Sequence, residues 1–259
     1  MAYFTPLSVV LAAALCGAML LCMELGRRLA HHEQARHPSG TRSGVGVIDG
    51  AVFGLLALLT AFTFAAAASR FDDRRRLITQ EANAISTAWD RVDLLPAASQ
   101  PAIRDGFRRY LDARLAAYRA LPDDAAWQAE LAVAERARSD VWTRTVTAVS
   151  GEGGDRARVL IIPSLNEMFD IAQTRILARR AHPPAAIYLL LVIASLVAAL
   201  LAGYNMASGA TRNWAYMIGF AATTALTVYV IVDIEFPRVG VVRVDSYDQG
   251  LVQVRARMH

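Results

Sequence analysis

The sequence predicts an all-α, polytopic membrane protein with four transmembrane helices and a cytosolic helical bundle inserted between spans two and three. Hydrophobic residues make up 55% of the chain, and the mean hydropathy of +0.31 is high for a soluble protein. Four apolar runs reach the roughly 20 residues that a helix needs to cross a bilayer. Between the second and third runs lies a long stretch rich in Ala, Arg, Glu and Leu, with apolar residues at helical spacing.

The four apolar runs are expected to span the membrane at residues 4–25, 47–69, 185–204 and 213–232. Asp49 stands near the start of the second run, where its carboxylate is expected to cap the helix N-terminus. None of the runs has a charged residue near its centre. Because such charges mark proton relays and paths for charged substrates, their absence disfavours a transporter of that kind.

These runs divide the chain into four parts. The expected parts are a transmembrane hairpin at 1–69, a cytosolic four-helix region at 70–184, a second transmembrane hairpin at 185–235 and a cytosolic tail at 236–259.

The second run passes directly into charge. Residues 61–77 read AFTFAAAASRFDDRRRL, with no Gly or Pro at the change from apolar to charged residues. Asp72 precedes Arg75 and Arg76, and Asp73 precedes Arg76, by three or four residues, the order that favours ion pairs on a helix. One helix is therefore expected to leave the membrane and continue into the cytosolic region.

Four amphipathic helices are expected in that region, at residues 71–94, 102–120, 123–149 and 155–180. Each carries its apolar residues on one side, so the four are expected to bury these stripes together as a bundle. The tail after them alternates Val with polar residues, a pattern that predicts a short strand.

Arginines near the span ends set the expected orientation, because cytoplasmic loops are enriched in basic residues. All 27 basic residues are Arg, a bias that indicates a GC-rich bacterial source. With the N-terminus inside, the cytoplasmic side holds Arg70, Arg74, Arg75, Arg76, Arg175, Arg179, Arg180, Arg238 and Arg243. The other side holds Arg27, Arg28, Arg36, Arg42 and Arg212, so the first loop favours the opposite orientation. Because nine of these arginines lie on the cytoplasmic side and five on the other, the sequence predicts a protein of the bacterial inner membrane with both termini cytoplasmic.

Two groups of polar residues are candidate sites. A polar network that fixes the helix register of the bundle is one hypothesis, with solvated helix faces as the alternative; its members are Glu81, Asn83, Asn166, Glu167, Asp170 and Arg175. Asp233 and Glu235 follow the fourth span, just before Pro237. They form either a cation site or interfacial groups that pair with Arg.

Other chemistry finds little support. The segment HHEQARH offers His31, His32, Glu33 and His37 as metal ligands, but a solvated loop is favoured because the spacing matches no known metal motif. No phosphate-binding loop, CxxC pair or nucleophile elbow is present. We therefore expect no enzyme, no cofactor and no metal. Nucleic acid is excluded as a partner because no basic stripe or recognition motif occurs.

Two motifs resemble a known family. SRFDDRRRLITQEANAISTAWDRVDLLP at 69–96 and DIEFPRVG at 233–240 resemble the bacterial bestrophin-like membrane proteins. The resemblance covers nearly the whole chain. It implies a distant relation to the bestrophins, which are pentameric anion or cation channels with four spans and a helical cytosolic region between spans two and three. A homo-oligomer in the lipid bilayer that passes small inorganic ions is implied.

The resemblance also implies a pore. In bestrophins the second span forms a hydrophobic neck ahead of an Arg-aromatic stretch, and matching Arg70 to that stretch places Gly54, Leu58 and Phe62 at the neck. Glycine departs from the bulky pattern, so the extent of the neck is open. Ordinary packing is the alternative for Leu58 and Phe62. The acidic segment that binds calcium in animal members is missing, so calcium gating is not implied.

The preferred function is a homo-oligomeric ion channel with a pore lined by span two. Anions are favoured because four Arg, Arg70 among them, face only two Asp at the inner mouth. The first alternative is a membrane-anchored helical sensor or scaffold without channel activity, and the second is a membrane-embedded enzyme.

Overall fold

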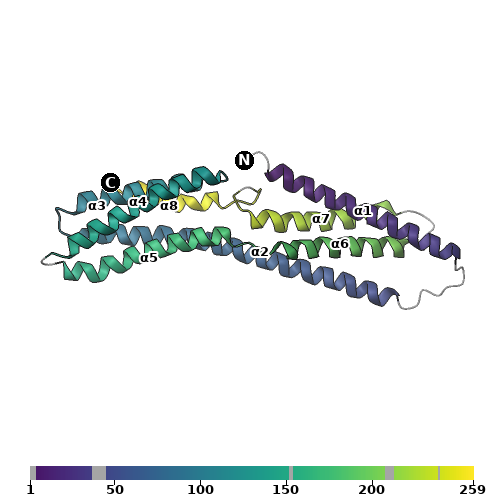
Figure 1. Ribbon diagram of the computed structural model, residues 1–259. Coiled ribbons are helices and arrows are strands. Elements are labelled where there is room, and N and C mark those ends of the chain that lie inside the picture. Colours follow the sequence, from purple (N-terminus) through teal and green to yellow (C-terminus); the bar gives the residue numbers. More distant parts are fainter. Residues whose placement is uncertain (1–3, 37–44, 152–153, 208–212, 239) are drawn as a thin grey trace. The chain divides into compact units, whose positions relative to one another are not determined.

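The structure is a computed structural model that describes residues 4–36, 45–151, 154–207, 213–238 and 240–259 (Figure 1). Every regular element among these residues is helical. In chain order the elements are α1 (Phe4–Arg36), α2 (Val45–Asp90), η1 (Arg91–Leu94), α3 (Gln100–Ala120), α4 (Asp124–Val149), α5 (Asp155–Arg180), α6 (Ala185–Met206), α7 (Trp214–Glu235), η2 (Asp245–Asp248) and α8 (Gln249–Arg257).

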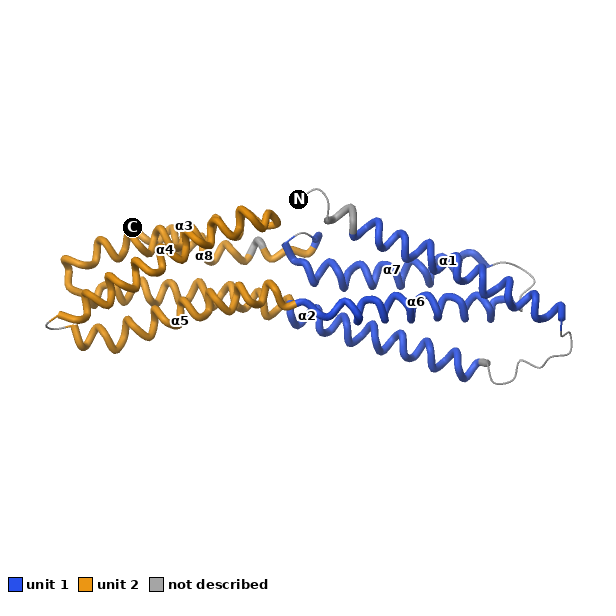
Figure 2. Tube along the Cα trace, in the orientation of Figure 1, with its two compact units in different colours: residues 1–70, 182–241 blue, residues 71–181, 242–259 orange. Residues whose placement is uncertain are grey.

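The chain forms two compact units (Figure 2). Unit 1 comprises residues 1–70 and 182–241, and unit 2 comprises residues 71–181 and 242–259. Four helical segments are long and apolar enough to cross a membrane. They fall on α1, the first part of α2, α6 and α7. The predicted all-α fold with four membrane-spanning helices is therefore confirmed.

Close helix packing in unit 1 depends on two glycines. A Cβ on Gly26 of α1 would collide with the backbone carbonyl oxygen of Leu200 in α6, and a Cβ on Gly203 would collide with that of Met23. Since backbone atoms cannot rotate aside, only glycine permits α1 and α6 to approach this closely. Met19 and Met23 fill the adjoining core with Ala199.

The expected role of Asp49 as an N-cap is wrong. The second span helix begins at Val45, so Asp49 lies inside its first turns and not at its start. Its side chain is buried, and Asn205 of α6 donates a hydrogen bond from Nδ2 to its Oδ2 at 2.6 Å. Apolar residues continue upstream of Asp49 as Val45-Gly46-Val47-Ile48, which extends the helix before any polar residue can stop it.

The prediction that one helix runs from the membrane run into the charged run is confirmed. α2 is a single 46-residue helix, and the change from apolar to charged residues falls inside it. Arg75 pairs with Asp72 at 3.0 Å, and Arg76 pairs with Asp73. Both pairs join residues three positions apart, as the acid-before-base order predicts.

Unit 2 is built around one apolar core from α2, α3, α4 and α5. The rings of Trp89 in α2 and Phe107 in α3 meet edge to face at 6.0 Å. Asp123 caps α4 by accepting hydrogen bonds from the backbone nitrogens of Ala125 and Ala126. The four helices and their shared burial agree with the sequence prediction, apart from small shifts at the ends.

The predicted strand in the tail is wrong. Residues 249–257 form α8, which packs against α3 with Leu251 and, beyond its end, Met258 buried. Arg255 donates two hydrogen bonds to Asp112 of α3, from Nε to Oδ1 at 2.7 Å and from Nη2 to Oδ2 at 3.0 Å. An isolated strand would leave its backbone groups without ladder partners, whereas a helix satisfies them internally.

Candidate functional site

The face of α2 that carries Gly54, Leu58 and Phe62 is exposed in the single chain. Leu58 is 51% exposed and Phe62 is 66% exposed, and a Cβ built on Gly54 meets no atom within 4 Å. Residues four apart lie on one helix face. The three predicted pore positions therefore form an apolar stripe that the other described residues leave exposed.

The opposite face of α2 is buried within unit 1. Leu56 and Ala67 belong to one cluster with Leu191 of α6 and Ile231 of α7. Phe53 also meets Phe220 of α7 edge to face at 5.9 Å. α2 thus uses one face for contacts within the chain, and the Leu58 face is left for lipid or another molecule.

Arg70 does not share that exposed stripe. Its side chain is only partly exposed, because it turns toward a carboxylate of α7. Its Nη2 lies 2.7 Å from Glu235 Oε2, and its Nε donates to the same oxygen at 2.9 Å. Glu235 is fully buried, so this carboxylate neutralises the charge of Arg70 inside unit 1.

Glu235 also contacts His182, the first residue of the His182-Pro183-Pro184 segment that precedes α6. Glu235 Oε1 lies 3.1 Å from His182 Nδ1, and the His182 ring stacks on Phe236 at 4.8 Å. The carboxylate of Glu235, at the end of α7, therefore contacts both α2 and the segment 182–184 before α6.

Asp233 organises the turn after α7. Both of its carboxylate oxygens accept from the backbone nitrogen of Val241, at 2.9 and 3.0 Å. A Cβ on Gly240 would collide with this carboxylate, which explains the glycine in DIEFPRVG. Because Asp233 and Glu235 both have protein partners, the structure favours the alternative in which they are paired groups over a cation site.

Metal ligation gains no support from the described residues, which contain no group of three or more His, Cys, Asp or Glu side chains able to hold an ion. His31, His32 and Glu33 lie on the last turns of α1, and Tyr204 donates a hydrogen bond to Glu33. His37, the fourth candidate ligand, lies outside the described residues.

The core of unit 2 contains a buried network of charges. Glu81 of α2 accepts a hydrogen bond from Arg114 Nε of α3 at 2.8 Å and one from Arg175 Nη1 of α5 at 2.6 Å. Arg175 also binds Asp248, just before α8, at 2.6 Å, and it stacks over Tyr118 at 3.6 Å. The positive charges of Arg114 and Arg175 are therefore balanced by the negative charges of Glu81 and Asp248.

The network fixes the protonation of its members. Burial alone would raise the pKa of Glu81, but Arg114 and Arg175 outweigh that effect and hold the pKa below its ordinary value. Burial alone would lower the pKa of Arg114, yet Tyr118 and Glu81 raise it above its ordinary value. Glu81 is thus a carboxylate and Arg114 is a cation throughout the physiological range.

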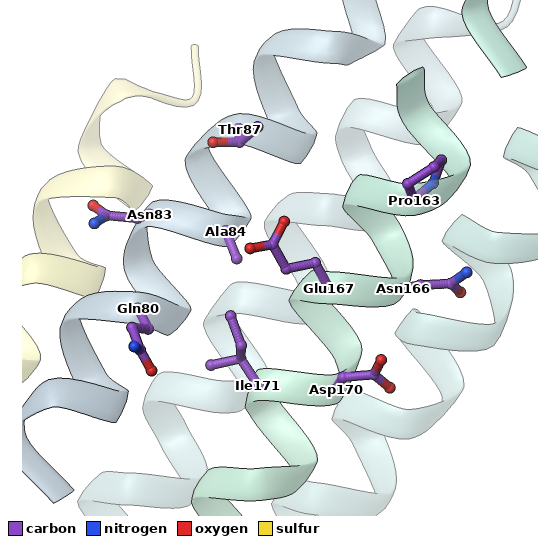
Figure 3. A pocket seen from close by; sticks show the side chains of 9 residues that line it. All are labelled: Gln80, Asn83, Ala84, Thr87, Pro163, Asn166, Glu167, Asp170 and Ile171. Atoms are coloured by element: carbon purple, nitrogen blue, oxygen red, sulfur yellow. The ribbon is translucent and has the colours of Figure 1, made fainter. Parts of the chain in front are cut away.

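The predicted polar network is therefore brought together only in part. Glu81 and Arg175 meet, but Asn83, Asn166, Glu167 and Asp170 are exposed. All four line a groove of about 750 Å³ between α2 and α5 (Figure 3). Figure 3 shows Glu167 and Ile171 between the two helices, whereas Asn166 and Asp170 point to the other side of α5.

Arg114 is the network member that sequence reasoning missed. It lies four residues after Tyr110 and four before Tyr118, both on the apolar stripe of α3. An arginine on an apolar stripe is a signal of a buried partner, and it was available in the sequence. Asp248 had no such signal because its position depends on how the tail packs.

Taken together, an all-helical four-span unit, a second helical unit with a buried charge network, and one long helix common to both define an α-helical polytopic membrane protein. A family model described as the Bestrophin-like domain matches residues 9–247. The chain belongs to this bestrophin-like family.

Solved structures show the same fold. A bacterial bestrophin homolog from Klebsiella pneumoniae that carries a tyrosine-to-alanine mutation matches with a TM-score of 0.61 and 17% identity, over 92% of this chain and 98% of that one. The same homolog with a tryptophan-to-alanine mutation matches with a TM-score of 0.60 and 14% identity, over 95% and 98% of the two chains. No curated protein matches the sequence.

Proposed function

We propose that this protein is the subunit of a homo-oligomeric ion channel whose pore is lined by α2. The observation that carries the proposal is the exposed stripe of Gly54, Leu58 and Phe62 in a chain that belongs to the bestrophin-like family. Copies arranged around an axis with this stripe inward would stack rings of Leu and Phe side chains. Such hydrophobic rings gate by dewetting. By family resemblance the assembly is a pentamer.

Anions are the favoured ions in this proposal. The segment that follows span two holds Arg74, Arg75 and Arg76 against Asp72 and Asp73, which supplies a small positive excess. The pairing of Arg70 with Glu235 removes the charge of Arg70 from that excess. The preference is therefore modest, and reversal potentials in a chloride gradient measure it.

The test is conduction by purified protein in lipid bilayers. We expect a symmetric oligomer with an ionic conductance, and we expect Phe62→Ala to change it by widening the narrowest ring. Leu189→Ala is the matched control, because Leu189 is similarly exposed (60% against 66% for Phe62) but lies on α6. A monomer without conductance contradicts the proposal, as does a conductance that Phe62→Ala leaves unchanged.

The proposed placement is the bacterial inner membrane, with residues 70–184, the tail and both termini in the cytoplasm. Single cysteines at Ala97 or Ser150 in a variant without Cys16 and Cys22 test it by accessibility labelling in whole cells. If an impermeant reagent added outside the cells labels these cysteines, the bundle lies in the periplasm, and the sensor or scaffold alternative is favoured.

A further inference from the structure

A cavity of about 500 Å³ lies within unit 2, between α3, α4 and α5. One part of its wall is apolar, from Leu131, Ala134, Phe169, Ala172 and Ile176, and Arg114 and Gln173 line it as well. Three ionisable side chains stand at its exposed rim, Glu135, Arg138 and Asp170. Apolar walls with a few polar groups are typical of small-molecule sites.

Tyr110 lines this cavity and offers its hydroxyl to a ligand. Its side chain is 2% exposed, and its ring meets Phe169 edge to face at 5.9 Å. Within the part of the chain that the structure describes, its hydroxyl makes no hydrogen bond. The ring is buried, but the hydroxyl oxygen is not among the buried atoms without a partner, so it is accessible from the cavity. Burial also raises the pKa of this hydroxyl, so it is a neutral phenol that can accept a hydrogen bond.

The charges that border the cavity leave one carboxylate without a counterion. Arg114 is neutralised by Glu81, and Arg138 pairs with Glu135 at 2.5 Å. Asp170 has no ion-pair partner among the described residues, and Figure 3 shows its carboxylate pointing away from α2. The lining residues carry no net charge, but both arginines have carboxylate partners, so Asp170 is the one lining carboxylate left to attract a cation.

We propose that this cavity binds a small amphipathic amine. The Asp170 carboxylate and the Tyr110 hydroxyl hold the ammonium group, and the apolar walls hold the hydrocarbon body. A carboxylate ligand would meet the unpaired charge of Asp170, and a bare metal ion would leave the apolar walls empty. The proposal does not depend on ion conduction.

Thermal unfolding of the purified full-length protein tests the proposal with three probes of similar size. They are 2-phenylethylammonium, the neutral 2-phenylethanol and the anionic 3-phenylpropanoate. We expect the ammonium probe to raise the unfolding midpoint in a saturable way, the alcohol to act more weakly and the anion to have no effect. Asp170→Asn should weaken ammonium binding about tenfold or more, because a charge-assisted hydrogen bond is lost.

Glu167→Gln is the matched control. Glu167 is an exposed carboxylate on the same helix, one turn earlier, but it borders the groove toward α2 and not this cavity. Binding should survive Glu167→Gln and weaken in Tyr110→Phe. Equal stabilisation by the anion, or equal binding in wild type and Asp170→Asn, overturns the proposal. Asp170 is exposed, so Asp170→Asn should fold and keep this test decisive.

Discussion

Glu81 is the residue on which the interior of unit 2 depends, because one carboxylate separates two buried guanidinium groups. Glu81→Gln keeps the shape of the side chain but leaves the cations facing each other. Breaking a buried pair in this way costs about 3–5 kcal/mol. We expect a clear loss of stability in denaturant unfolding of the detergent-solubilised protein.

The control for that loss is Glu135→Gln. Glu135 forms an exposed pair with Arg138, and exposed pairs contribute only about 0–1 kcal/mol. Equal destabilisation by the two variants would contradict the importance of the buried network.

The same carboxylate predicts a dependence on pH. Its pKa is depressed in the folded protein, so its contribution to stability is present above the unfolded-state pKa, about 4.3. The contribution is lost as the pH falls below that value toward the lower folded-state pKa. Stability should therefore fall more steeply with acid in wild type than in Glu81→Gln, as unfolding midpoints between neutral and acidic pH will show.

Single residues also show where sequence reasoning ends. Glu81 and Arg175 could be named as network members from their charge and position, but Asn83 and Asn166 proved to be exposed. Each asparagine lies next to a buried residue on its helix, and a shift of one residue turns a side chain by about 100°, from the core toward solvent. That rotation depends on how the helices pack, which one chain's polarity pattern does not specify.

At the level of the elements, the contact of α1 with α6 is fixed by glycine. Gly203→Ala places a Cβ against the backbone of Met23, so we expect the helices to separate and the protein to lose thermal stability. Gly219→Ala on α7 is the control, because no atom lies within 4 Å of the Cβ built there. Alanine favours helix over glycine by about 1 kcal/mol, so the control should be neutral or stabilising. Similar loss in both variants would contradict the close packing.

Elements differ in how well the sequence predicts them. The spans and the four bundle helices follow from long apolar runs and 3.6-residue periodicity, which are local properties. The tail was misassigned because a short alternating segment fits a strand and a helix equally well. Its contacts with α3, through Leu251 and Arg255, decide between them, and these are remote in sequence.

For the whole molecule, the tail is expected to stabilise unit 2 specifically. Deleting residues 242–259 removes Asp248, Leu251 and Met258, so Arg175 loses one partner and apolar surface of α3 becomes exposed. Limited trypsin digestion should then cut the arginines of the bundle faster than in wild type. Val252→Ala changes a partly exposed tail residue and serves as the control. Unchanged resistance in the deletion variant would refute this role.

The buried network also places a condition on the order of synthesis. Glu81, Arg114 and Arg175 all precede α6 and α7 in the chain, whereas Asp248 follows them. While the last two spans are being made and inserted, the interior of the bundle therefore holds two cations and one carboxylate. The charges of this network can balance only once Asp248 has been made, after α7, which makes the final packing of unit 2 one of the last steps of biogenesis.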